Sequence, residues 1–232
     1  MRYRILFIVC SFALFCSGAV HATALFGTFT MNGIFSITDT SVSFSSSVSP
    51  FASGEFTLSG GTGSFAGSDG TNDVNSISGA VGTLFPATVF ISFPSGPAQT
   101  LNLDMIDAGG DGSTDCSAPP ASGQVCTPAA VSGQILSMLN LQNNPVGSSA
   151  VWLVSGVTSD GLSDWTARFT VQFTVPYQTV LSEIAAGQAT NTYSATVDVT
   201  PDISPTPEPG TLVMLGSGLL GMAGLIRRKV RL

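Results

Sequence analysis

Acidic turn segments carry the side chains with the clearest capacity for chemistry in this sequence. The segment DMIDAGGDGSTD (104–115) places Asp107, Asp111 and Asp115 in a glycine-rich turn, and DGTND (69–73) is a smaller acidic turn. Hard cations such as Ca²⁺ favour oxygen-rich, flexible loops of this kind, but neither segment follows the EF-hand spacing. We therefore expect no cofactor, with calcium at Asp107, Asp111 and Asp115 as the alternative.

Paired carboxylates are a second source of chemistry. Glycoside hydrolysis needs two facing carboxyl groups about 5–10 Å apart and requires neither His nor Lys, and the chain contains fourteen Asp and Glu residues. Glu55 and Glu183 are the only glutamates between residues 25 and 200, and neither stands in a recognisable catalytic motif. We expect a noncatalytic protein, and keep a carbohydrate-active hydrolase as the alternative.

Aromatic side chains on a sheet face could stack on sugar rings, although core packing is the default interpretation for each of them: Trp152, Trp165, Tyr177 and Tyr193. Trp165 follows a turn at 160–161 and is flanked by polar residues, so we expect it to be exposed and to bind ligand. We expect Arg168 to form an ion pair with Asp164 or with another acid.

The N-terminal residues 1–24 predict a secretory signal peptide. They combine a short basic region, an apolar stretch, and small residues that allow cleavage after Ala22 or Ala24. Cleavage removes His21, the only histidine, and leaves no lysine before Lys229. This excludes His-dependent nucleophile relays, His-ligated zinc and Schiff-base lysines in the exported domain.

Export also decides how the two remaining cysteines are interpreted. Cys116 and Cys126 lie ten residues apart in DCSAPPASGQVC, and an even pair in an oxidising compartment predicts one disulfide. Closing so short a loop stabilises the fold by about 2 to 3 kcal/mol in the chain-entropy model.

The charge distribution separates the ends of the chain from its middle. Between Ile5 and Ile226 the only cation is Arg168, whereas all fourteen acids lie in that span. So negative a field repels phosphate backbones, and we therefore expect no nucleic-acid partner.

Period-two alternation predicts the elements that position these residues. It is clearest in RFTVQFTV (168–175) and TYSATVDVT (192–200), and glycine-rich turns separate many such short segments. We expect an all-β, antiparallel β-sandwich or jelly-roll-like ectodomain over residues 25–200, with short helices near 132–141 and 180–186.

The C-terminal segments follow in a fixed order. A proline-rich linker occupies 201–209, and the 17 uncharged residues 210–226 predict a transmembrane helix of about 25 Å. The basic tail 227–232 then halts translocation and stays cytoplasmic.

These C-terminal residues resemble a PEP-CTERM protein-sorting domain. The resemblance rests on Pro207-Glu208-Pro209, the apolar stretch LVMLGSGLLGMAGL, and Arg227-Arg228-Lys229 close to the C-terminus. It implies export in a Gram-negative bacterium, transient residence in the inner membrane, recognition by a membrane-embedded exosortase, and processing near the Pro-Glu-Pro signature. It further implies release or re-attachment at the cell surface, in the setting of exopolysaccharide and biofilm production.

We therefore expect an exported surface or extracellular-matrix protein with a noncatalytic structural or carbohydrate-binding role. The expected partners are the exosortase and exopolysaccharide. The alternative is an extracellular β-sandwich hydrolase that uses paired carboxylates.

Overall fold

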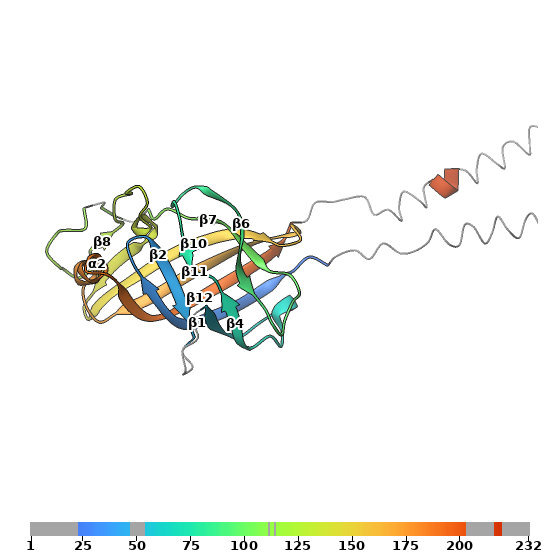
Figure 1. The fold of residues 1–232 in the computed structure, drawn as a ribbon, viewed down its shortest axis with the longest axis horizontal. Helices are drawn as coiled ribbons and strands as arrows, with labels where there is room; N and C mark the ends of the chain where they lie inside the picture. Colours follow the sequence, from blue (N-terminus) through green and yellow to red (C-terminus); the bar gives the residue numbers. More distant parts are fainter. Residues whose placement is uncertain (1–22, 47–53, 111, 114, 203–215, 220–232) are drawn as a thin grey trace, which may run out of the picture. The chain divides into compact units, whose positions relative to one another are not determined.

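The computed structural model of this protein describes residues 23–46, 54–110, 112–113, 115–202 and 216–219. Twelve strands of this described part form one sheet, and all pairings between these strands are antiparallel. Figure 1 shows the long strands running side by side through the ectodomain. The all-β, antiparallel prediction is confirmed.

The elements follow one another along the chain with short connections. They are β1 (Gly27–Ile37), β2 (Ser41–Ser45), β3 (Glu55–Ser59), the 3-10 helix η1 (Gly63–Phe65), β4 (Gly70–Val74), β5 (Ile77–Ser78), β6 (Leu84–Ser92), β7 (Leu101–Ile106), β8 (Val125–Cys126), the 3-10 helix η2 (Leu136–Met138), β9 (Asn140–Asn144), β10 (Gly147–Thr158), β11 (Ser163–Phe173), α2 (Tyr177–Ala185) and β12 (Ala189–Pro201).

The sheet closes on itself, which corrects the expectation of two stacked sheets. Its strands run in the order β11-β12-β1-β3-β4-β6-β7-β10, and β10 then pairs with β11 from Ser148↔Phe173 to Val157↔Asp164. Irregularities in the β10–β7 and β6–β7 ladders accompany this curvature, because bulges bend a strand and increase its twist. Alternation in the sequence predicts strands but does not say whether the two edges of a sheet will meet.

Two long strands each change partner halfway along one edge. β1 pairs with β3 through Thr30–Asn32 and with β2 through Ile34–Ile37. β10 pairs with β9 through its first half and with β7 through its second half. The ring is therefore continuous at one end only, and at the other end β2–β5 and β8–β9 extend from β1 and β10, while α2 contacts β9, β10 and β12.

Helix α2 packs against the core at this second end. It buries Tyr177, Val180 and Ile184, and the last two share a narrow internal gap with Phe35 and Trp152. The helix that we expected at 180–186 is thus confirmed and starts slightly earlier. The helix expected at 132–141 is wrong, because only the short η2 forms before β9 begins at Asn140.

An aromatic cluster fills the interior of the closed sheet. The rings of Trp152 and Phe169 stack with centroids 5.0 Å apart and planes 4° apart. Phe44 contacts Phe169, and its ring centroid lies 6.0 Å from that of Phe90. Phe44, Trp152 and Phe169 come from inward positions of alternating strands, so the alternation in the sequence specifies this part of the core.

The two ends of the ectodomain lie next to each other. Gly27 pairs with Val199, and the β1–β12 ladder continues from there to Ile37↔Ala189. Figure 1 shows the chain entering β1 and leaving β12 at the same end of the sheet.

Residues 1–22 of the predicted signal peptide and most of the C-terminal segments lie outside the described residues. Of the segment expected to cross the membrane, residues 216–219 are described, and they are helical. Among the described residues, no helix has both the length and the apolar character needed to span a bilayer.

Candidate functional site

A groove on the outer face of β9, β10 and β11 is the candidate site, and we name it the Arg168 groove. It is a hollow of about 430 Å³ whose lining includes Asn140, Gln142, Ser149, Val151, Leu153 and Arg168. Val125 of β8 forms one wall. Aliphatic surface with a few converging polar groups is the usual composition of a small-molecule site.

Arg168 points outward because of its position in the alternation of β11. Its neighbours Ala167 and Phe169 are buried, whereas Arg168 is exposed. In the ladder it faces Leu153 on β10 and Thr196 on β12. Arg168 and Asp164 lie four residues apart on β11, a rise of about 13 Å along the strand, which is too far for the ion pair expected between them. Pairing of Arg168 with another acid stays a prediction.

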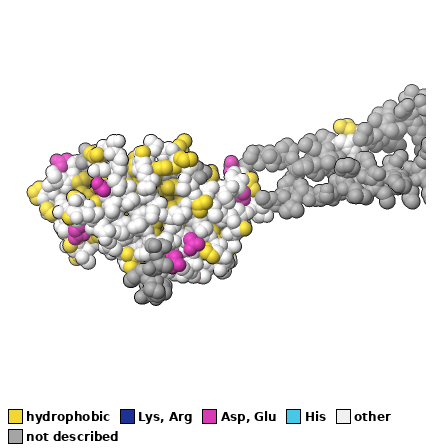
Figure 2. All heavy atoms as spheres, viewed as in Figure 1, with side chains coloured by type: hydrophobic (Ala, Val, Ile, Leu, Met, Phe, Trp, Pro, Cys, Tyr) yellow, Lys and Arg dark blue, Asp and Glu magenta, His cyan; other side chains and the backbone are white. Residues whose placement is uncertain are grey.

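Among the acids of the ectodomain, Asp107 lies beside the groove, because its backbone N–H donates to the carbonyl of the lining residue Leu153 at 3.1 Å. None of the groove's lining residues is Asp or Glu. On the face drawn in Figure 2, acidic side chains are scattered among a mainly uncharged surface. The Arg168 groove therefore combines the single cation of the 5–226 segment with a lining that carries no negative charge.

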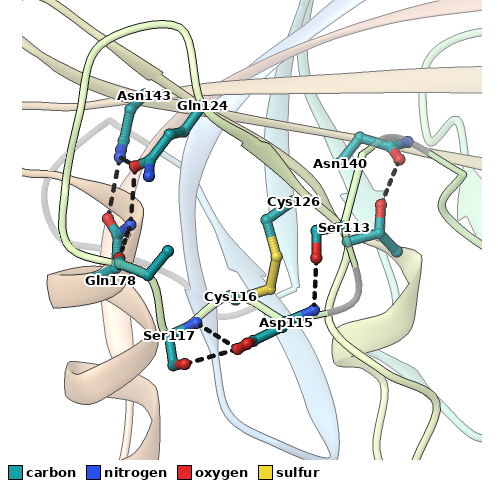
Figure 3. Close-up of a disulfide and its surroundings, with 11 residues drawn as sticks. Ser113, Asp115, Cys116, Ser117, Gln124, Cys126, Asn140, Asn143 and Gln178 are labelled. Carbon is teal, nitrogen blue, oxygen red and sulfur yellow. Dashed lines mark hydrogen bonds between the residues drawn. A yellow bond between two sulfur atoms is a disulfide. The ribbon is translucent and has the colours of Figure 1, made fainter.

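A disulfide between Cys116 and Cys126 holds the wall of this groove, as the sequence predicted (Figure 3). The two Cα atoms lie 5.6 Å apart. Cys126 is fully buried and pairs with Leu141 of β9, while its neighbour Val125 pairs with Gln142. Because β8 has only two residues, the disulfide fixes a wall that its own ladder would hold weakly.

An amide cluster ties the same loop to α2 (Figure 3). The Asn143 Nδ2 donates to Gln124 Oε1 at 3.1 Å and to Gln178 Oε1 at 3.0 Å. Gln178 Nε2 donates to the Ala118 carbonyl at 2.9 Å, and the Tyr177 backbone N–H donates to Asn143 Oδ1 at 2.9 Å. These bonds hold β9, the disulfide loop and the start of α2 in one arrangement.

Asp115 serves the local turn beside the disulfide. Its Oδ1 accepts hydrogen bonds from the Ser117 hydroxyl at 2.6 Å and from the Ser117 backbone N–H at 3.0 Å. These two bonds lower the pKa of Asp115 below its usual value. Burial, and secondarily the charge of Asp115, raises the pKa of Tyr177.

The calcium alternative receives no geometric support from the described part of the acidic loop. Asp111 lies outside the described residues, and within them no group of three His, Cys, Asp or Glu side chains could hold a metal. Burial raises the pKa of Asp107. In the smaller turn, Asn72 is buried and its amide donates to the Ser68 and Gly70 carbonyls. Calcium binding stays a prediction for experiment.

Trp165 is buried, which corrects the expectation that it is exposed. Only 1% of its surface is accessible. Its Nε1 donates to the Asn102 carbonyl at 2.9 Å, and its ring stacks on Phe90 with centroids 5.7 Å apart. The other aromatic candidates, Trp152, Tyr177 and Tyr193, are also buried. None of the four can offer a stacking surface to a sugar.

Two carboxylate pairs occur elsewhere on the ectodomain. Glu55 and Asp73 are direct partners in the β3–β4 ladder. Burial, and secondarily the charge of Asp164, raises the pKa of Asp104 on β7. Neither pair lines the Arg168 groove.

The residues of the sorting signal, Pro207, Glu208, Pro209, Arg227, Arg228 and Lys229, lie outside the described residues. Sequence comparison supplies the evidence for them. No curated protein matches the chain, and no solved structure matches it. A family model described as "PEP-CTERM protein-sorting motif" matches residues 205–229. The chain is therefore a protein that carries the PEP-CTERM sorting motif, attached to an ectodomain without a recognised relative.

Proposed function

We propose that this protein is a noncatalytic component of the cell surface or extracellular matrix that binds polysaccharide. The sorting motif at 205–229 is the observation that carries the proposal. It implies an exported protein that an exosortase sorts and processes. Polysaccharide is the abundant material in the compartment to which the resemblance assigns such proteins.

The outer face of the sheet supports a carbohydrate-binding role. One row of paired residues crosses six strands, from β9 through β10, β11, β12 and β1 to β3. Its members are uncharged and mostly carry amide or hydroxyl groups, although the Thr57 hydroxyl is buried and cannot reach a ligand: Asn140, Val151, Thr170, Ser194, Asn32 and Thr57. Such groups both donate and accept hydrogen bonds, as sugar hydroxyls do.

The sorting step is tested by intact-mass analysis of the protein from a parent strain and from a strain without the processing enzyme. We expect the parent strain to yield a chain that ends near residue 209, and the mutant strain to retain residues 227–232. Recovery of the full C-terminus from both strains would contradict the proposal.

Polysaccharide binding is tested by fractionation of the extracellular material. We expect the protein to sediment with the matrix of a parent strain and to appear in the soluble fraction when polysaccharide synthesis is deleted. An unrelated secreted protein serves as the control for trapping. Equal partitioning in both strains would refute binding while leaving the sorting step intact.

A hydrolase remains the second candidate because of the Asp104–Asp164 pair. A carboxyl group whose pKa is raised beside a second carboxylate is the arrangement that general acid catalysis uses. If the pair is catalytic, the protein releases reducing ends from matrix polysaccharide and Asp104→Asn abolishes this release. Because we favour a noncatalytic role, we expect neither the unchanged protein nor Asp104→Asn to release reducing ends.

A further inference from the structure

We propose that the Arg168 groove binds an acidic sugar residue, with its carboxylate on the Arg168 guanidinium. This inference deepens the proposed polysaccharide-binding function and rests on it. Gln142 and Ser149 provide polar groups for the hydroxyls of the sugar. Val151 and Leu153 provide apolar surface for the C–H groups of its ring.

Charge selects an anionic ligand for this groove. The guanidinium is always protonated and presents a planar set of donors that matches a carboxylate in a bidentate pair. Arg168 is exposed and stands among uncharged side chains. Asp107 lies beside the groove but is not one of its lining residues, so no carboxylate of the lining itself competes for the guanidinium.

Size and shape select a sugar unit over a larger partner. The hollow of about 430 Å³ falls at the lower end of the range of roughly 300–1,000 Å³ typical of small-molecule sites. Nucleic acid would need several cations along its backbone, whereas the ectodomain offers one. A polysaccharide with spaced carboxylates needs only one cation per binding unit.

The structure holds the groove in a fixed shape. Asn140 Oδ1 accepts hydrogen bonds from the Gly110 backbone N–H at 2.9 Å and from the Thr127 hydroxyl at 3.0 Å. The Cys116–Cys126 disulfide holds β8, and therefore Val125, against β9. A site with fixed walls loses little conformational entropy when a ligand binds.

The test measures binding of the exported, processed protein to a trisaccharide of galacturonic acid and to its methyl ester by calorimetry. The ester has the same shape but lacks the charge. We expect binding to the acid, and a loss of about tenfold or more both with the ester and with Arg168→Gln, because a charge-assisted pair is removed. Arg168→Lys, which retains the charge, should keep part of the affinity.

The matched control is Thr166→Gln, which changes an exposed residue on the same face of β11 outside the groove. It should bind as the unchanged protein does. Equal binding of acid and ester that Arg168→Gln does not affect would overturn this inference while supporting neutral-sugar binding. No binding of either trisaccharide by a protein that still sediments with the matrix would overturn it as well and leave the proposed function standing. Failure of both assays would overturn both.

Discussion

The ring of Tyr193 lies across Gly33, its direct partner in the β1–β12 ladder. A Cβ atom at position 33 would stand 3.1 Å from Tyr193 Cε1 and 2.6 Å from the Ser45 carbonyl oxygen. The absence of a side chain at Gly33 therefore gives the tyrosine ring its place inside the closed sheet. Aromatic residues commonly cover strand glycines in this way.

Gly33→Ala should destabilise the ectodomain by about 1 to 3 kcal/mol, because the added methyl group overpacks a full core. Urea unfolding of the exported protein measures the change. Gly110→Ala is the control, since a Cβ there meets nothing within 4 Å. Equal stability of Gly33→Ala and the unchanged protein would show that this packing is wrong.

Tyr193→Phe should stabilise the protein by about 1 kcal/mol. The Tyr193 hydroxyl is buried without a hydrogen-bond partner, and an unsatisfied buried group costs roughly 1 to 3 kcal/mol. Burial also raises the pKa of Tyr193 above its usual value of 10.0. The folded state then holds the proton more tightly, so the stability of the unchanged protein falls as the pH rises through 10.0. Thermal unfolding across this range should show a smaller fall for Tyr193→Phe, and an identical fall would contradict the assignment.

Asp104→Asn should raise the melting temperature at neutral pH. The folded protein raises the pKa of Asp104 above 3.8, so its ionised form is penalised and stability falls as the pH rises through that value. Below pH 3.8 the carboxyl group is protonated, and the gain should disappear. Calorimetry at neutral pH and below pH 3.8 tests this prediction. Asp39→Asn, in an exposed bend between β1 and β2, is the control. A gain that persists in acid would have another cause.

Replacing both cysteines by alanine should lower stability by about 2 to 3 kcal/mol, because the unfolded chain gains loop entropy. It should also weaken binding of the galacturonic acid trisaccharide several-fold, since the disulfide fixes the Val125 wall. Reduction of the unchanged protein should reproduce both effects. If the variant is destabilised but binds the trisaccharide as tightly as the unchanged protein, the disulfide does not support binding in the groove.

Calcium chelation should leave the melting temperature unchanged, because the Asp115 carboxylate already accepts two hydrogen bonds from Ser117. If calcium bound at Asp107, Asp111 and Asp115, removing it would lower the melting temperature by mass action. A fall with chelator that added calcium reverses would support the calcium alternative.

Alternation in the sequence predicted most of the long strands and their inward side chains, but it was applied too narrowly at one place. The pattern that puts Phe169, Val171 and Phe173 inside extends backward to Trp165, because β11 begins at Ser163. The polar neighbours of Trp165 are the outward positions of the same strand. Extending the strand by two alternations would have predicted its burial.

The Arg168 groove could not be predicted from local patterns. One wall is β9, whose sequence NLQNN contains no β-branched or aromatic residue, and we expected a helix to end there. β4, with the sequence GTNDV, was likewise interpreted as part of a turn. β9 forms on an edge of the long strand β10, and β4 forms between β3 and β6, a tertiary influence that local propensity does not contain.

The pairing of Gly27 with Val199 has a consequence for engineering. Because the first and last strands begin and end together, a short peptide could join them, and the chain could be opened in the exposed turn at 160–161 instead. Such a circular permutant would keep every strand pairing of the sheet and would lose only the turn that joins β10 to β11. The C-terminal segments would then follow β10 instead of β12.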